Sequence, residues 1–185
     1  MVSIMECIRE NSVIAAVRSM EDFIKATQSG GSIIFDLSPD ISDVAKKTEL
    51  AHNAGKKLFI HLDLASGIGK DKSGILFVKS IGVDGIISTR VNIIKSARDA
   101  GLFTVQRFFA VDSQSVDTAA ESQKASKADM IEIMPGIVPK VISGLKNSIS
   151  VPIIAGGLIE TEKEISDAID AGAAAVSTGK AKLWR

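Results

Sequence analysis

The chain has 185 residues, of which 45% are hydrophobic, and its 22 lysines and arginines balance its 22 aspartates and glutamates. This composition is that of one folded domain, which we expect to span residues 1–185. The balanced charge excludes the global positive field that marks many nucleic-acid-binding proteins. Cys7 is the sole cysteine, which excludes a disulfide framework and a thiol zinc site. Because no apolar stretch approaches the roughly 18 residues of a membrane span, we expect a cytoplasmic protein without membrane contact.

Short apolar segments alternate with helical patterns along the chain. A first helix is expected over residues 1–10, and strands are expected at 13–17, 32–37, 57–64, 84–88, 102–107, 129–134, 153–155 and 173–176. Strands that alternate with helices indicate a parallel sheet. The eight repeats predict a small α/β barrel of the (β/α)₈, or TIM, type, and an open doubly wound sheet is the alternative.

The end of the chain is too short for a complete eighth helix, because only residues 180–185 follow the last repeat. We therefore expect the eighth helix to be truncated. Another element must then cover the outside of the eighth and first strands. The N-terminal helix, a partner subunit in a homo-oligomer, or both could do so, and the sequence does not choose between them.

Two glycine-containing turns follow the last two strands. Glycine directly after a parallel strand lets backbone N–H groups approach an anion closely, and a helix N-terminus adds a favourable dipole. The last two turns of (β/α)₈ barrels commonly bind phosphate. We therefore predict a phosphate site rather than two ordinary turns, and its expected members are Gly156, Gly157, Thr178, Gly179 and Lys180.

Polar side chains occur near the carboxyl ends of the other expected strands. Side chains alternate along a strand, so the parity that directs Ala16 into the barrel also directs Arg18 inward. The same parity predicts a ring at the barrel mouth formed by Arg18, Asp36, Asp63, Ser88, Glu132 and one of the adjacent Gln106 and Arg107, of which Arg107 is the ligand-binding candidate. Such a ring indicates a site for a small polar molecule, and charges that simply meet solvent are the alternative.

Other motifs do not favour nucleotide, metal or covalent chemistry. The segment 67–73 lacks the glycine spacing of a P-loop and is interpreted as a mobile loop over the mouth. His61 has acids near it, but one histidine without a second gives little support for a metal site. Cys7 has no obvious histidine partner for a nucleophilic role. We expect no cofactor, no metal and no catalytic residue.

Six ordered motifs carry a resemblance to a known family and span nearly the whole chain. They are 59–64 (FIHLDL) with 67–71, 85–90 (GIISTR), 106–109 (QRFF) with 112–113, 131–137 (IEIMPGI) with 139, 152–157 (PIIAGG) and 182–184 (KLW). The chain resembles the glycerol-3-phosphate-responsive antiterminators, which regulate glycerol-uptake operons. The resemblance implies a small (β/α)₈ barrel that senses glycerol 3-phosphate and acts on leader mRNA without catalysis.

The resemblance also implies roles for individual residues. Asp63 and Glu132 would accept hydrogen bonds from the glycerol hydroxyls, and the phosphate would be held by Gly156, Gly157, Thr178 and Gly179. The sequence departs from the family pattern at 177–180 (STGK), where a Thr-Ser type pair is expected and Gly179 lacks the hydroxyl. It departs again at 66–69, which is richer in glycine. These departures bear on the identity of the ligand and not on the fold.

Two classes of function remain open: a ligand-gated RNA-binding regulator, and a phosphate-handling barrel enzyme such as an isomerase, epimerase or aldolase. Such an enzyme needs a Lys, Cys or His at a strand end, and the expected inward positions supply carboxylates and one histidine but no lysine. We therefore favour the regulator. Because the chain is neutral overall, RNA contacts must come from local clusters. The lysines between 46 and 57 are better interpreted as a solvated face, which leaves Lys70, Lys72 and Lys182 as the expected contacts.

Overall fold

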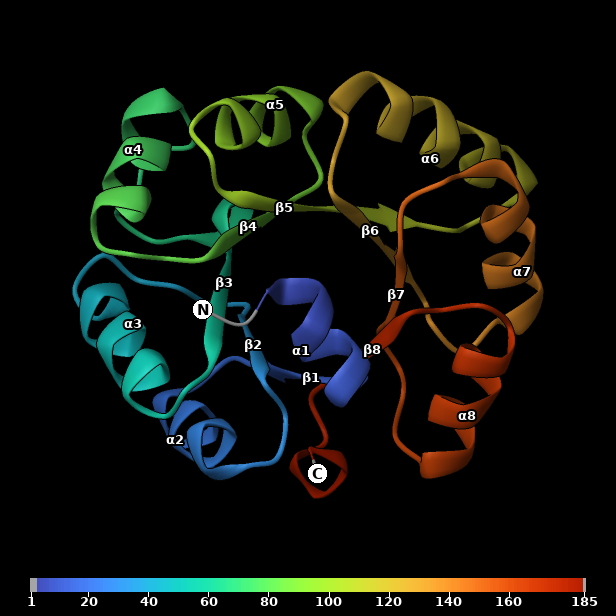
Figure 1. Ribbon diagram of the computed structural model, residues 1–185. Coiled ribbons are helices and arrows are strands. Elements are labelled where there is room, and N and C mark those ends of the chain that lie inside the picture. Colours follow the sequence, from blue (N-terminus) through green and yellow to red (C-terminus); the bar gives the residue numbers. More distant parts are fainter. Residues whose placement is uncertain (1–2, 185) are drawn as a thin grey trace.

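The computed structural model describes residues 3–184, and within them eight parallel strands close into one barrel (Figure 1). Each strand pairs with its sequence neighbours, and β1 closes the ring by pairing with β8. The strands are β1 (Val13–Val17), β2 (Ile33–Asp36), β3 (Lys57–His61), β4 (Gly85–Ser88), β5 (Phe103–Phe109), β6 (Met130–Met134), β7 (Ile153–Gly156) and β8 (Ala175–Thr178). Closure confirms the predicted (β/α)₈ barrel and excludes the open sheet.

Eight helices accompany the strands in the described residues, and all of them except α1 form the outer layer of the ring. They are α1 (Ile4–Glu10), α2 (Met20–Gln28), α3 (Val44–Asn53), α4 (Lys72–Ser80), α5 (Val91–Asp99), α6 (Ser113–Ser126), α7 (Pro139–Ser148) and α8 (Glu162–Asp170), with short 3₁₀ turns η1 (Leu62–Leu64) and η2 (Ala181–Leu183). Side chains that precede the helices fix where they begin. Ser19 caps the Asp22 N–H at the start of α2, and Thr161 and Glu164 form a reciprocal capping box at α8.

Three strands differ from the expected ones by two or more residues at an end. β3 ends at His61, where the chain turns into η1, so Asp63 lies beyond the strand. β5 continues to Phe109, two residues past the expected end. β8 begins at Ala175 and includes Ser177 and Thr178, which are polar but buried and hydrogen-bonded inside the fold. A polar residue can continue a buried strand when its hydroxyl finds a partner.

α1 does not belong to the outer layer but lies across the centre of the ring in Figure 1. Its Cys7 and Ile8 are buried with the side chains that fill the barrel, which include Ile14, Phe35 and Phe59. This helix therefore closes the N-terminal end of the barrel. The thiol of Cys7 is part of that apolar plug, and burial raises its pKa.

The end of the chain covers the outside of β8 and β1. The side chain of Trp184 is only 3% exposed, and its Nε1 donates to the Thr178 carbonyl at 2.7 Å. Its own carbonyl accepts from Gly30 N–H at 3.1 Å, which ties the chain end to the segment after α2. Leu183 is buried in a separate apolar cluster that also contains Val176 of β8. The prediction that no full helix follows β8 is confirmed for the described residues. The short turn η2 and Trp184 take the place of that helix, whereas α8 precedes β8.

The residues that fill the barrel correct the expected parity of two strands. Ile33, Phe35 and Leu37 of the second repeat belong to the interior cluster, so Asp36 points outward. Ile87 of β4 is also interior, so Ser88 points outward as well. The expected inward direction of Asp36 and Ser88 was therefore wrong. A register assignment that is off by one residue sends every side chain of a strand to the opposite face.

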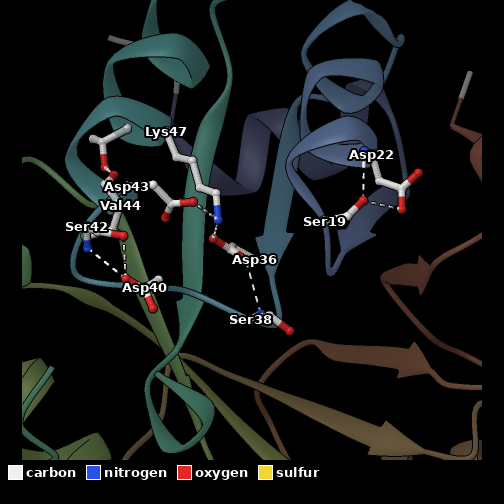
Figure 2. Close-up of polar contacts among 10 residues, drawn as sticks. Ser19, Asp22, Asp36, Ser38, Asp40, Ser42, Asp43, Val44 and Lys47 are labelled. Carbon is white, nitrogen blue, oxygen red and sulfur yellow. Dashed lines mark hydrogen bonds and ion pairs between the residues drawn. The ribbon is translucent and has the colours of Figure 1, made fainter. Parts of the chain in front are cut away.

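Asp36 instead forms a buried ion pair between β2 and α3, shown in Figure 2. Its Oδ2 lies 2.9 Å from Lys47 Nζ, with the two side chains 1% and 5% exposed, and Asp43 lies 3.2 Å from the same nitrogen. Burial alone lowers the pKa of Lys47, but the carboxylates of Asp36 and Asp43 outweigh it and raise that pKa. The group holds α3 against the barrel by charge rather than by apolar contact alone.

Lys47→Ala should therefore destabilise the protein by about 3–5 kcal/mol, because it leaves a buried carboxylate without its cation. The adjacent Lys46 is exposed and is a matched control, so Lys46→Ala should change stability by no more than about 0.5 kcal/mol. Urea denaturation at pH 7 compares the two variants. Equal unfolding free energies would contradict a stabilising role for the Lys47 charge.

Candidate ligand-binding site

A cavity of about 220 Å³ opens at the carboxyl ends of the strands. Its lining comes from the first, second and fifth to eighth repeats, and consists of Ala16, Arg18, Asp22, Leu37, Arg107, Glu132, Met134, Gly157, Leu158, Ile159, Ser177, Thr178 and Gly179. Both apolar and polar residues line it, as is typical of a small-molecule site. Arg18, Arg107, Glu132, Gly157, Thr178 and Gly179 were predicted for such a site, and the structure brings these six together.

A buried carboxylate organises the floor of this cavity. Glu132 is 1% exposed and accepts from Arg107 Nε at 2.6 Å and from Ser177 Oγ at 2.6 Å. Arg107 is therefore the inward residue of its pair. Gln106 points outward and bonds to Ser122 and Ser126 of α6.

Gly156 provides the space for this carboxylate. A Cβ atom at this position would collide with Glu132 Oε1 and Ser177 Oγ. Gly156 does not line the cavity, and neither does Lys180, whose ammonium pairs with Glu160 at 2.9 Å. The structure thus separates these two residues from the other three of the predicted phosphate group.

The loop after β7 presents backbone donors to the cavity. Gly157 and Leu158 both have positive φ, 78° and 63°, which turns the chain sharply over the mouth. Among the described residues, the N–H groups of Gly157, Leu158 and Gly179 donate no hydrogen bond. Unpaired donors at a glycine turn suit an anion.

The N-terminus of α8 does not contribute such donors. The Glu164 carboxylate accepts from the backbone N–H groups of Glu160 and Thr161 at 2.7 and 2.9 Å, and the Thr161 side chain caps the helix. The capping box thus satisfies this end of the helix internally. The expectation that a helix dipole would help to bind the anion is not met at this helix.

The cavity carries two cations. Arg18 is exposed and forms no ion pair within the described residues, whereas Arg107 shares its Nε with Glu132. Asp22 also lines the cavity, but its carboxylate bonds to Ser19 Oγ. The charges of Arg107 and Glu132 therefore neutralise each other within the cavity, whereas the charge of Arg18 remains available to a ligand.

His61 lies buried on the inward face of β3, 4% exposed. Burial lowers its pKa to about 4, and the positive charge of Arg107 adds to that effect. Its Nδ1 has no hydrogen-bond partner among the described residues. The described residues contain no group of three or more metal-ligating side chains, so His61 does not gather acids around it.

Asp63 and Ser88 do not line the cavity. The Asp63 carboxylate accepts from Ser88 Oγ, Thr89 N and Thr89 Oγ1 at 2.7–2.9 Å. Burial alone would raise the pKa of Asp63, but these hydrogen bonds outweigh it and lower that pKa. Asp63 therefore fixes the loop between β4 and α5. The ligand contact that was expected of Asp63 stays a prediction, since its side chain is not among the cavity residues.

The residues expected to contact RNA lie in separate parts of the ring. Lys72 opens α4 and Lys70 lies in the loop before it, whereas Lys182 belongs to η2 at the chain end. Figure 1 shows α4 and the chain end in different sectors of the outer layer. The three lysines therefore do not form one continuous surface.

Several cavity residues escaped the sequence interpretation. Ser177 was expected in a turn. It lies two residues after Ala175, whose side chain points inward, so strand alternation could have predicted that Ser177 points inward as well. Leu158 and Ile159 carry no such signal, because only the backbone conformation of the loop brings them to the cavity. Separately, no helix within the described residues has the length and apolar character required to cross a membrane.

Comparison with known proteins identifies a family. The family described as "Glycerol-3-phosphate responsive antiterminator" matches residues 13–184. Uncharacterized protein YgcP of Escherichia coli K12 is 37% identical over 182 residues, covering 98% of this chain and 95% of that protein.

Two crystal structures are similar to this fold. A glycerol uptake operon antiterminator regulatory protein from Listeria monocytogenes has a TM-score of 0.89 and 32% identity, covering 94% of this chain and 95% of that one. A glycerol uptake operon antiterminator-related protein from Thermotoga maritima has a TM-score of 0.83 and 32% identity, covering 94% and 97%.

His61 should make the fold sensitive to acid. The unfolded chain protonates this histidine near its ordinary pKa of 6.5, whereas the folded chain does so only near pH 4, so stability falls as pH drops through that window. The loss between pH 7 and 4.5 should be about 2 kcal/mol from this residue. Urea denaturation of wild type and His61→Leu at both pH values measures it. An identical pH dependence in the two proteins would contradict the assignment.

Proposed function

Because the chain belongs to the glycerol-3-phosphate responsive antiterminator family, we propose that it senses glycerol 3-phosphate and acts on the leader mRNA of glycerol-utilisation operons in the cytoplasm. The observation that carries the proposal is the pairing, in one cavity, of unpaired backbone donors with a buried carboxylate. A phosphorylated polyol has an anion at one end and hydroxyl donors at the other, so its chemistry matches both.

The phosphate is assigned to the side of the cavity formed by the two last loops. The N–H groups of Gly157, Leu158 and Gly179 supply donors there, and Arg18 supplies an unpaired cation. Thr178 positions these loops rather than binding directly, because its Oγ1 already donates to the Ile159 carbonyl at 2.7 Å and accepts from Lys180 N–H at 3.1 Å.

The hydroxyl end is assigned to Glu132 and Ser177 on the cavity floor. A carboxylate has room for more hydrogen bonds than the two that Glu132 receives from Arg107 and Ser177. It can therefore accept from a ligand hydroxyl without losing its structural partners. This assignment does not use Asp63, whose carboxylate oxygens already accept hydrogen bonds from Ser88 and Thr89 in the β4–α5 loop.

A phosphate-handling barrel enzyme is the second candidate, and the fold alone favours it. "QR15, an Aldolase" shares the fold with a TM-score of 0.75 at 13% identity, covering 93% of this chain and 91% of that one. No lysine, cysteine or histidine is among the described cavity residues, and the Glu132 carboxylate is already bound by Arg107. These features support a sensor over proton transfer or Schiff-base chemistry.

Calorimetric titration tests the ligand. Glycerol 3-phosphate should bind more tightly than either inorganic phosphate or glycerol, because each of these engages only one side of the cavity. NMR of the ligand over hours should show no conversion. Turnover of a triose or pentose phosphate that Glu132→Gln abolishes would support the enzyme instead.

Arg18→Gln should weaken glycerol 3-phosphate binding by about tenfold to a hundredfold, because it removes a charge-assisted hydrogen bond. Stability should stay within about 0.5 kcal/mol of wild type, since Arg18 is exposed and unpaired. Arg9→Gln is the matched control, as Arg9 is an exposed arginine of α1 at the closed end of the barrel. If both variants bind the ligand like wild type, Arg18 does not contact the phosphate.

The regulatory part of the proposal has its own measurement. In vitro transcription through a glycerol-operon leader should show more readthrough when the protein and glycerol 3-phosphate are both present than with either alone. Readthrough that ignores the ligand would contradict the sensing role. Readthrough that ignores the protein would contradict antitermination.

A further inference from the structure

Four basic side chains lie together at the end of the barrel opposite the cavity. Lys95 and Arg98 lie three residues apart in the second half of α5, and Lys124 and Lys127 lie three residues apart at the end of α6. These helices are packed neighbours at the top of Figure 1. Their C-terminal ends lie where the strands begin, which is the closed end of the barrel. The four residues are named the α5–α6 basic surface.

Two adjoining hollows lie within this surface. One, of about 470 Å³, is lined by Arg98, Lys124 and Lys127, and the other, of about 270 Å³, is lined by Lys95, Arg98 and Lys127. Because Arg98 and Lys127 line both, the hollows form one continuous depression. A phosphate chain laid along it would meet cations from both helices.

The four cations are exposed, and none of them forms an ion pair within residues 3–184. Two carboxylates, Asp99 and Asp129, also line the hollows. Asp129 Oδ2 is already engaged by the backbone N–H and the hydroxyl of Thr104, at 2.8 and 2.6 Å. The surface therefore carries an excess of positive charge, although the chain as a whole is neutral.

Three cations at the ligand-binding end lie close to carboxylates, whereas Arg18, Lys70 and Lys72 form no ion pair within the described residues. Arg107 pairs with Glu132, and Lys180 pairs with Glu160. Arg90 lies 3.7 Å from Asp63. The opposite end of the barrel therefore differs in gathering four unpaired cations around one depression.

Cations near a helix C-terminus also stabilise that helix through its dipole. This accounts for basic residues in the last turns of α5 and α6. It does not require the two helices to direct four unpaired cations around a shared depression. The depression also lacks aromatic side chains, since its other members are Gln123, Ala125, Ser126, Ala128 and Val151.

We propose that the α5–α6 basic surface binds the phosphate backbone of RNA, an inference that rests on the proposed antitermination function. Protein partners are usually anchored by aromatic or large apolar groups, which the depression does not offer. RNA bases are read by stacking, which also needs aromatic groups. The surface therefore suits backbone phosphates, and it positions the RNA without reading its sequence.

The test uses the full chain and a fluorescently labelled transcript of a glycerol-operon leader, with glycerol 3-phosphate present. The surface variant is Lys95→Gln, Arg98→Gln, Lys124→Gln and Lys127→Gln combined. The charge-matched control changes three other lysines and one arginine, all exposed: Arg9→Gln, Lys46→Gln, Lys140→Gln and Lys146→Gln. A third variant carries Lys70→Ala, Lys72→Ala and Lys182→Ala. Calorimetric binding of glycerol 3-phosphate checks that each variant keeps its cavity.

The surface variant should lose the steep salt dependence of RNA binding. Four phosphate contacts on single-stranded RNA contribute a log–log slope of about −3, so between about 50 and 200 mM salt wild type should lose roughly fiftyfold more affinity than the variant. The charge-matched control should behave like wild type, and all proteins should bind glycerol 3-phosphate equally.

Two results would overturn the inference and leave the proposed function standing. One is RNA binding by the surface variant with the affinity and salt slope of wild type. The other is loss of binding only in the Lys70, Lys72 and Lys182 variant, which would place the RNA at the mouth. If the wild-type protein binds glycerol 3-phosphate but not the transcript, the result would instead contradict both the antitermination function and RNA binding at this surface.

Discussion

The structure of the barrel mouth depends on one buried carboxylate. Glu132 is only 1% exposed, and a buried carboxylate requires hydrogen-bond donors. Arg107 Nε and Ser177 Oγ supply them, each 2.6 Å away. These donors come from β5 and β8, on either side of β6 and β7. β7 contributes Gly156, whose missing side chain is the space that the carboxylate occupies. Four consecutive strands are thereby fitted to a single functional group.

The loops above that carboxylate follow from its support. Ser177 is held on the floor by Glu132, so the next residue, Thr178, points outward and secures the Ile159 carbonyl. That contact ties the loop after β8 to the loop after β7. The two positive-φ residues Gly157 and Leu158 are thus kept over the cavity with their N–H groups unpaired. A rigid floor and tied loops reduce the ordering cost of binding a small ligand.

The two ends of the barrel are built differently. The N-terminal end is closed by an apolar plug from α1, whose Cys7 and Ile8 pack with the side chains that fill the barrel. The outer layer is fastened by charge at Asp36, Lys47 and Asp43, and by Trp184 where a full eighth helix is absent. Average composition conceals this arrangement, since a chain with no net charge gathers four unpaired cations around one depression at the closed end of the barrel.

The sequence by itself determined the alternation of eight strands with helices and the glycine turns after β7 and β8, because these depend on residues close together in the chain. Only the tertiary structure decided which polar side chains face the cavity. Arg107 points inward and Gln106 outward, while Asp36 and Ser88 lie on the helix side. A shift of one residue in register reverses every such direction, and register is fixed by packing across the barrel rather than by local pattern. The replacement of a helix after β8 by Trp184 also depends on tertiary packing, so residues 180–185 alone could not predict it.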